Sequence, residues 1–293
     1  MPAIALRSGT IDYTDTEAAA DAAPGPARET LVLVPGLGFD ESVWQPVVDR
    51  LRTDFRVLVP VLPIGGHRRP MDPGADLSAQ GVAALLAEFL DRLDLREVTL
   101  VQNDAGIAQL LVGVQDERIA RLVLASCEAL DNYPPGFQGK TLHAASRIPG
   151  ALRLLLQSFR SPFLAGMQTS LGGMAARPIP HELVLRWYGP LLGDPAIRRD
   201  LTAFLRGTRK DTYLRAAERL RTFDRPALVV WGAQDRMMPP ATGRRLAGLL
   251  PRGEYVEIPD SRTLISLDNP EALCEALRRF ITAHPAPVRR GTA

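Results

Sequence analysis

The sequence predicts an α/β fold, a mostly parallel sheet flanked by helices, with an inserted helical cap. Two observations support this prediction. Short apolar runs alternate with stretches of helical periodicity over residues 31–125 and again over residues 227–283, which is the rhythm of βαβ units. Between them, residues 131–221 hold helical segments punctuated by Pro and Gly, without a convincing strand. We therefore expect a core formed by residues 1–130 and 222–293 and a cap formed by residues 131–221.

The individual elements follow from apolar patterning and from capping signals. Runs rich in Val, Leu and Ile are the predicted strands: residues 11–13, 31–34, 56–61, 98–101, 122–125, 227–231 and 255–258. Apolar residues at helical spacing predict the core helices: residues 44–51, 79–93, 107–114, 241–250 and 270–283. Ser78 suits an N-cap, and Pro270 after Asn269 suits a first helical position. Residues 18–27, rich in Ala, Pro and Gly, are expected to form a surface loop or a mobile arm.

Charge and composition exclude several functional classes. The chain has 293 residues with 35 Lys and Arg against 33 Asp and Glu, and its net charge of +2 offers no electrostatic footprint for nucleic acid. Its two cysteines are too few for a fold that disulfide bonds stabilise. No apolar run approaches the roughly 20 residues that a membrane span needs. Because the N-terminus also lacks a secretory signal pattern, we expect a soluble cytoplasmic protein without a nucleic-acid or membrane partner.

The most informative segment runs from Val98 to Gly106, where a strand is followed directly by a tight turn and a helical pattern. Such a turn lifts its central side chain above the sheet edge, and that side chain is Asp104. The N–H of Ala105 would then face the reaction centre and help to stabilise negative charge there. Gln102 departs from the pattern, since a small residue usually lies two positions before the reactive one. The turn favours a functional role for Asp104 over a structural one.

With this segment the chain resembles the α/β-hydrolase superfamily, specifically the branch with an aspartate nucleophile, which includes haloalkane dehalogenases and epoxide hydrolases. The resemblance extends over residues 28–283 and includes three further features in the family's order. Leu33 to Gly38 is similar to the loop that completes the oxyanion hole, with Pro35 replacing the usual His and the N–H of Leu37 as the second donor. Val230 to Asp235 is similar to the strand end that supplies the catalytic acid. The long helical insertion matches the family's cap.

The chain departs from the family at the catalytic histidine. Aligned on Pro270, that position falls on Thr263, and none of the four histidines lies in this segment. An aspartate can still form an ester with a carbon atom, but hydrolysing the ester needs a base to activate water, which threonine cannot supply at neutral pH. His67 is the nearest substitute, because it follows a strand end at the ligand-binding edge of the sheet and titrates near neutral pH. A loop histidine whose ring is satisfied by backbone contacts or by solvent is the alternative.

The identity of the catalytic acid stays open at this point. Asp235 either acts as an acid or base, or caps the helix that begins near Pro240. Glu128 and Asp131 follow another strand end and could replace it. Loop carboxylates at such positions are, however, more often solvated.

Two aromatic residues are candidates for substrate contact. Trp44 follows the loop with the predicted oxyanion donor, although its spacing with Val47 and Val48 also fits core packing. In the cap, Tyr188 could donate a hydrogen bond to an epoxide oxygen, as the resemblance implies, or serve only in packing. No Trp follows Asp104, so the halide-stabilising indole of the family's dehalogenases is missing there.

These observations predict an enzyme that acts on a small organic substrate held between core and cap, with Asp104 as nucleophile or acid/base. Hydrolysis of the epoxide-hydrolase or dehalogenase type is the first specific expectation. A non-hydrolytic cyclase, lyase or isomerase is the alternative, since acid/base work needs no ester hydrolysis, and a non-catalytic binding protein is another. The sequence has no metal-ligand cluster, dinucleotide fingerprint or phosphate-binding loop, so no cofactor is expected. A homodimer stays open.

Overall fold

The computed structural model describes residues 1–17 and 28–286, so the loop predicted at residues 18–27 lies outside the described residues. Within them, the fold is built on an eight-stranded sheet in the order β1-β2-β4-β3-β5-β6-β7-β8. The strands β1, β2 and β4 pair antiparallel, and the pairs from β4 to β8 are parallel. The strand bounds are β1 Ala3–Leu6, β2 Gly9–Asp15, β3 Thr30–Val34, β4 Arg56–Pro60, β5 Val98–Asp104, β6 Ile119–Cys127, β7 Ala227–Gly232 and β8 Gly253–Ile258.

All seven predicted strands are present, and β1 is an additional short strand at the sheet edge. The central strands are buried on both faces, with all side chains of Leu31–Val34 fully enclosed. This explains why their sequences are continuous apolar runs without the alternation of a half-exposed strand.

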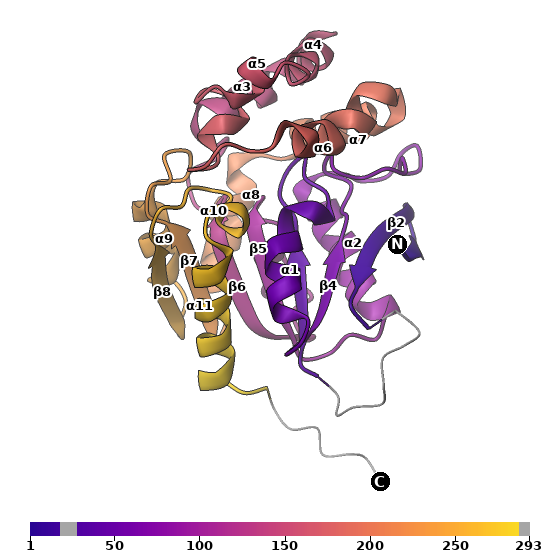
Figure 1. The fold of residues 1–293 in the computed structure, drawn as a ribbon. Helices are drawn as coiled ribbons and strands as arrows, with labels where there is room; N and C mark the ends of the chain where they lie inside the picture. Colours follow the sequence, from indigo (N-terminus) through magenta and orange to yellow (C-terminus); the bar gives the residue numbers. More distant parts are fainter. Residues whose placement is uncertain (18–27, 287–293) are drawn as a thin grey trace.

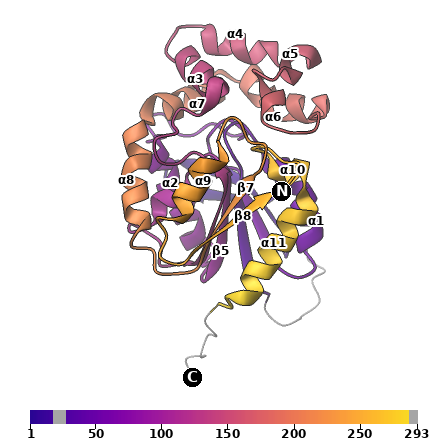
Figure 2. The ribbon, with the colours of Figure 1, turned by 90° about the vertical axis from the view of Figure 1, so that its left-hand side faces the viewer.

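Helices cover both faces of the sheet (Figures 1 and 2). One face carries α1 and α11, which contact each other, and the other carries α2, α8 and α9. Ser78 and Asn269 cap α2 and α11 as predicted, by accepting hydrogen bonds from backbone N–H groups of the first turn. The bounds are η1 Glu41–Trp44, α1 Gln45–Leu51, α2 Ala79–Arg92, η2 Ala108–Leu111, α8 Lys210–Leu220, α9 Pro240–Ala247, α10 Ile265–Asp268 and α11 Pro270–Ala283.

The helix predicted over residues 107–114 is wrong, because only the 3-10 turn η2 forms there. Two glutamine side chains replace the backbone bonds that an α-helix would make. Gln102 accepts a hydrogen bond from the N–H of Ala108, and Gln109 donates to the carbonyls of Gly106 and Glu128. A helical apolar pattern therefore does not identify the structure when buried side chains bind the same backbone groups.

The cap lies above the carboxyl ends of the parallel strands (Figure 1) and, as predicted, contains no strand within residues 131–221, all of which are described. The last helix of this segment, α8, instead runs beside the sheet and packs on η2. Within residues 131–221, the elements from α3 to α7 therefore lie over the edge of the sheet, and α8 lies beside it. The cap elements are α3 Gly136–Ala145, α4 Ala151–Ser158, α5 Pro162–Gly166, η3 Leu171–Gly173, α6 His181–Gly193 and α7 Pro195–Gly207.

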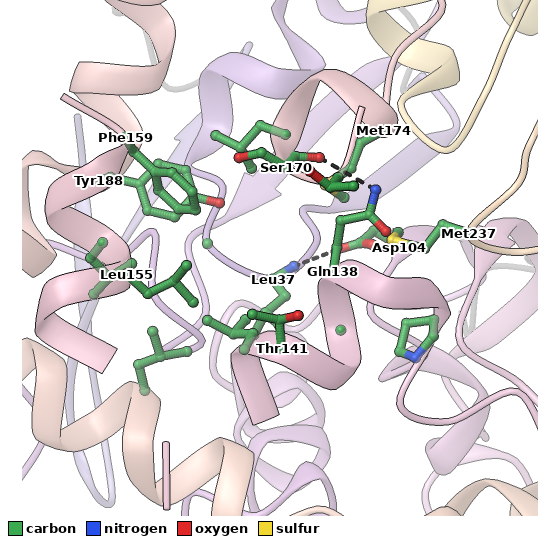
Figure 3. Close-up of a pocket in the computed structure, with 18 of the residues that line it drawn as sticks. Leu37, Asp104, Gln138, Thr141, Leu155, Phe159, Ser170, Met174, Tyr188 and Met237 are labelled. Carbon is green, nitrogen blue, oxygen red and sulfur yellow. Dashed lines mark hydrogen bonds between the residues drawn. The ribbon is translucent and has the colours of Figure 1, made fainter. Parts of the chain in front are cut away.

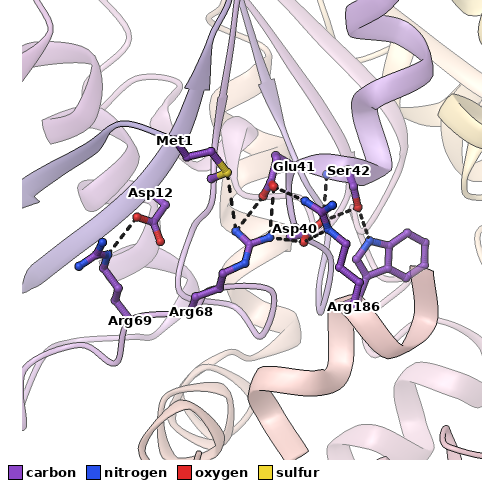
Figure 4. Close-up of polar contacts among 9 residues, drawn as sticks. Met1, Asp12, Asp40, Glu41, Ser42, Arg68, Arg69 and Arg186 are labelled. Carbon is purple, nitrogen blue, oxygen red and sulfur yellow. Dashed lines mark hydrogen bonds and ion pairs between the residues drawn. The ribbon is translucent and has the colours of Figure 1, made fainter. Parts of the chain in front are cut away.

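An ion-pair cluster fastens the cap to the core (Figure 4). Arg186 of α6 donates to Asp40 over 2.8 Å and to Glu41 over 2.5 Å, and Arg68 from a core loop bonds to the same two carboxylates. Asp40 is only 1% exposed, so its charge requires these partners. Among the described residues, no helix is both long and apolar enough to span a membrane.

Candidate active site

Five groups gather at the carboxyl edge of the sheet because they follow five neighbouring strands. In sheet order these are Leu37 after β3, Asp104 at the end of β5, Glu128 after β6, Asp235 after β7 and Thr263 after β8. The carboxyl ends of parallel strands meet at one edge, where the ligands of such folds bind. Residues far apart in the sequence are thereby brought to one place beneath the cap.

Asp104 sits in a strained turn and is tied to the loop after β3. Its φ of 65° lies in the left-handed region that few residues other than glycine adopt. The N–H of Leu37 donates to Asp104 Oδ2 over 2.8 Å, so the predicted oxyanion donor binds the carboxylate of the predicted nucleophile itself. A Cβ atom on Gly36 would lie 2.4 Å from both Cβ and Oδ2 of Asp104, which explains the glycine. Ala105, the other predicted donor, follows directly and is fully buried.

Glu128 is the second carboxyl group beside the reaction centre. Its backbone N–H donates to the carbonyl of Asp104 over 2.7 Å, so the ends of β5 and β6 are joined at this point. Its side chain is 4% exposed and accepts a hydrogen bond from the hydroxyl of Tyr213 over 2.6 Å. Both Glu128 and Asp104 line the same cavity. Two carboxyl groups therefore share one enclosed space.

Burial makes both of these carboxyl groups weaker acids than exposed carboxyl groups are. Loss of hydration raises the pKa of Asp104 to about 7, against the lowering effect of the Leu37 N–H and with a further rise from the charge of Asp235. Burial, followed by the charge of Asp104, raises the pKa of Glu128 to about 8. Both groups can therefore exchange a proton near neutral pH.

Asp235 is bound by local backbone and by the residue at the position of the missing histidine. Its carboxylate accepts from the N–H groups of Met237 and Met238, and from the hydroxyl of Thr263. Burial raises its pKa to about 6. Unlike Asp104 and Glu128, it does not line the cavity.

The cavity between core and cap is largely apolar and holds a few polar groups (Figure 3). Leu155 of α4, Phe159 directly after α4, and Met174 line it from the cap. Tyr188 of α6 packs edge-on against Phe159 and points its hydroxyl into the cavity. A Cβ atom on Gly38 would lie 2.9 Å from that hydroxyl, so the loop that contacts Asp104 also contacts the cap tyrosine.

His67 does not fit the predicted role of base. All four histidines lie in the described residues, and none lines the cavity. Gly65 N–H donates to His67 Nδ1 over 3.3 Å, so the proton of the neutral ring resides on Nε2, which faces Asp200 of α7 at 3.3 Å. The ring is 3% exposed. We assign it to holding its loop against the cap helix, which is the structural alternative considered from the sequence.

Trp44 is also removed from the cavity. Its side chain is fully buried in the core, in the packing that its spacing with Val47 and Val48 suggested, and it does not line the cavity. Tyr188, in contrast, lies where a substrate-binding role would place it.

Sequence reasoning gave too little weight to Glu128 and did not assign a role to Tyr213. The comparison with Asp131 explains why, since both residues follow β6 but only Asp131 is exposed, where it pairs with Arg245. The sequence offers only a weak signal, because the apolar run Leu122–Ala125 in β6 ends at Ser126, two residues before Glu128. The described residues contain no group of three or more His, Cys, Asp or Glu side chains placed to hold a metal ion.

Comparison with known proteins identifies the same fold. A model of the Alpha/beta hydrolase family matches residues 31–276. The chain is 25% identical to the uncharacterized hydrolase YugF of Bacillus subtilis over 259 residues. The aligned region covers 87% of this chain and 91% of YugF.

Solved structures agree with this match. A thermophilic esterase from Thermogutta terrifontis superposes with a TM-score of 0.71 and 20% identity, over 97% of this chain and 99% of the esterase. Haloalkane dehalogenase DbeA from Bradyrhizobium elkani gives a TM-score of 0.74 and 17% identity, over 96% and 97% of the two chains. At such identities these likenesses concern the fold alone.

Proposed function

The chain belongs to the alpha/beta hydrolase family, and from this premise we propose that it hydrolyses a small, largely apolar epoxide with Asp104 as nucleophile. The observation that carries the proposal is the way Asp104 is held. Oδ2 accepts the Leu37 N–H over 2.8 Å, whereas among the described residues Oδ1 has no hydrogen-bond partner. One carboxylate oxygen is thus fixed, and the other is free to attack a carbon atom in the cavity.

The first step opens the ring. Asp104 Oδ1 forms a bond to an epoxide carbon, the carbon–oxygen bond breaks, and the released oxygen takes the proton of Glu128. The Tyr188 hydroxyl can hydrogen-bond this oxygen as charge develops, because burial and the charge of Asp104 raise its pKa and keep it protonated. The products of this step are an alkyl ester on Asp104 and an ionised Glu128.

The second step hydrolyses the ester without a histidine. Ionised Glu128 takes a proton from water, and the resulting hydroxide adds to the carboxyl carbon (Cγ) of the Asp104 ester. The Leu37 N–H stabilises the oxyanion that forms at Oδ2. The tetrahedral intermediate then collapses and expels the product oxygen as an alkoxide, which takes the proton from Glu128. The proton left on Asp104 then passes to Glu128, so the pair ends as it began. This double use of one carboxyl group parallels the acid/base residue of retaining glycosidases.

An epoxide fits the cavity better than an alkyl halide. A released halide would lie beside Glu128 without a cation to stabilise it, because no Lys, Arg or His lines the cavity among the described residues. The residue after Asp104 is alanine, so no indole N–H faces the leaving group there. An epoxide oxygen, in contrast, can accept both a proton and a hydrogen bond from this site.

A non-hydrolytic isomerase, cyclase or lyase is the second candidate. It is favoured by the same pair of carboxyl groups, because Asp104 and Glu128 together hold both a base and an acid at neutral pH. The two candidates differ in whether water enters the reaction.

The deciding experiment traps the ester and traces water. Glu128→Gln slows ring opening, because water must then supply the proton, but it blocks ester hydrolysis by removing the base. Over a long incubation with a panel of epoxides it should therefore accumulate a substrate adduct on the peptide that carries Asp104. Asp131→Asn, an exposed acid three residues on, is the matched control and should accumulate none. A single wild-type turnover in ¹⁸O-water should label Asp104 before the product. Product that still lacks ¹⁸O after many turnovers would favour the non-hydrolytic candidate, and full activity of Asp104→Asn would exclude the nucleophilic role.

A further inference from the structure

The outer surface of the cap combines exposed apolar side chains with cations. Between residues 132 and 180 the sequence contains Lys140, Arg147, Arg153, Arg160 and Arg177 but no Asp or Glu, although the whole chain carries nearly balanced charge. All five of these cations are exposed. The charge of the protein is thus strongly asymmetric, and its positive end is the cap.

Large apolar side chains are exposed in the same segment. Leu154 of α4 is 70% exposed and Phe163 of α5 is 77% exposed. Ile148, just before α4, and Met167, just after α5, are also exposed. Both views of the fold place α4 and α5 at the end of the molecule farthest from most of the sheet (Figures 1 and 2). A group of exposed apolar side chains at one end of a protein indicates a surface that binds a partner or a membrane.

The cations of this surface are not neutralised within the protein. Among the described residues, Arg147, Arg153 and Arg160 form no ion pair. A second copy of the chain is a poor occupant, because a symmetric contact through this surface would bring the same cations face to face. An occupant that is both negative and apolar would satisfy both kinds of side chain.

We propose that this outer cap surface, defined by Ile148, Leu154, Phe163 and Met167 with Arg147, Arg153 and Arg160, binds the surface of a membrane that contains anionic lipid. The cations would lie among the headgroups, and Leu154 and Phe163 would enter the acyl boundary. Binding of this kind needs no spanning helix. The expectation of no membrane partner rested on the lack of a span, so surface binding departs from it without contradicting the sequence.

The position of α4 connects this surface with the cavity. Its inner residues Leu155 and Leu156 line the cavity, as does Phe159 directly after it, whereas Arg153 and Leu154 of the helix are exposed. A single helix therefore separates the apolar cavity from the proposed lipid contact. An apolar substrate dissolved in the membrane would meet the cap first. Membrane binding by this surface does not require Asp104 to act as a nucleophile.

Vesicle sedimentation tests the proposal on the full chain. The protein should sediment with vesicles of phosphatidylcholine mixed with phosphatidylglycerol at low salt, and much less with phosphatidylcholine alone or at high salt. Arg153→Gln with Arg160→Gln should weaken binding on the order of 20-fold, since each cation near an anionic surface contributes about fivefold. Leu154→Ser with Phe163→Ser should weaken it about tenfold.

The matched controls lie at the amino ends of the strands. Val114→Ser removes an apolar side chain that is 61% exposed before β6, and Arg252→Gln removes an exposed cation before β8. Both should bind like the wild type. Absence of vesicle binding, or binding that the cap variants leave unchanged, would overturn the proposal. So would a wild-type dimer, seen by sedimentation velocity without lipid, that Leu154→Ser with Phe163→Ser dissociates, because the surface would then join two copies.

Discussion

The hydroxyl of Thr263 lies 3.1 and 3.0 Å from the two carboxyl oxygens of Asp235 and donates its hydrogen bond to them. Thr263 occupies the position at which alignment on Pro270 places the family's histidine. It preserves a hydrogen bond to the acid while removing the base. The pair is therefore a structural contact at the edge of the site, and chemistry has to come from groups that reach the cavity.

Loss of this hydroxyl should destabilise the protein. Thr263→Val leaves the shape of the side chain nearly unchanged but removes a donor from Asp235, which is only 4% exposed. We expect a loss of about 1–3 kcal/mol in the free energy of unfolding, measured by urea denaturation at pH 8. Thr222→Val is the control, because that hydroxyl bonds only to a carbonyl of its own turn. Equal effects of the two changes would contradict a role for the Thr263–Asp235 bond.

Removal of the Asp104 charge should stabilise the protein while abolishing turnover. A carboxyl whose pKa is raised from 3.8 to about 7 binds its proton more tightly in the folded state than in the unfolded chain. Stability is therefore lost as pH rises between these two values. Asp104→Asn should raise the free energy of unfolding, by an amount that grows from pH 5 to pH 8 and reaches a few kcal/mol.

Thermal unfolding across this pH range measures the effect. Asp224→Asn is the control, because it removes the charge of an exposed carboxylate that lies outside the cavity. A wild-type stability that does not fall between pH 5 and pH 8 would mean that Asp104 is better hydrated than its burial indicates.

The pH dependence of turnover should be narrow. The proposed reaction needs Asp104 ionised and Glu128 protonated, and burial raises their pKa values to about 7 and about 8. The wild-type kcat/KM should rise through the first value and fall through the second, as a pair that shares one proton. Glu128→Gln should lose the falling limb and reduce kcat by about 10²–10⁴-fold. A falling limb that persists in Glu128→Gln would assign the proton to another group.

His67 should matter for stability and not for chemistry. His67→Phe removes the donor that faces Asp200, which is only 1% exposed and also accepts from the N–H of Met71. We expect a loss of about 1–3 kcal/mol in the free energy of unfolding, with kcat of the folded protein near the wild-type value. Asp200→Asn should lower stability similarly. If kcat falls more than tenfold in folded His67→Phe, the role of base returns to this histidine.

The fold was predictable because its signals are local and repeated. Seven strands and the two capped helices follow from apolar runs and from Ser78 and Asn269, and the sheet then carries Leu37 and Asp104 to one edge. The turn around Asp104 needed no knowledge of distant residues, since a strand, a short turn and small residues lie within one segment. Such local patterns predict the structure well because the local preference of each segment agrees with its burial in the fold.

The remaining features depend on which side chains the cap encloses. Glu128 and Asp131 are both acids after β6, and only packing beneath the cap separates a buried carboxyl from a solvated one. His67 follows a strand end, as a catalytic residue would, but Gly65 and Asp200 engage its ring nitrogens. Contacts between residues distant in the sequence decide such cases, and no pattern within one segment contains them.

The contact between Gly36 and Asp104 links two positions of the chain during evolution and redesign. A side chain at position 36 would occupy the space of the Asp104 carboxylate, because its Cβ would lie 2.4 Å from Oδ2. A larger residue at position 36 therefore requires a change at position 104 as well. A library that varies residue 36 while Asp104 is kept will return mostly inactive or misfolded clones. Exchange of the reactive group for a shorter one would release this constraint. The spectrum of reactions open to descendants of this scaffold is thus limited by a glycine that takes no part in the chemistry.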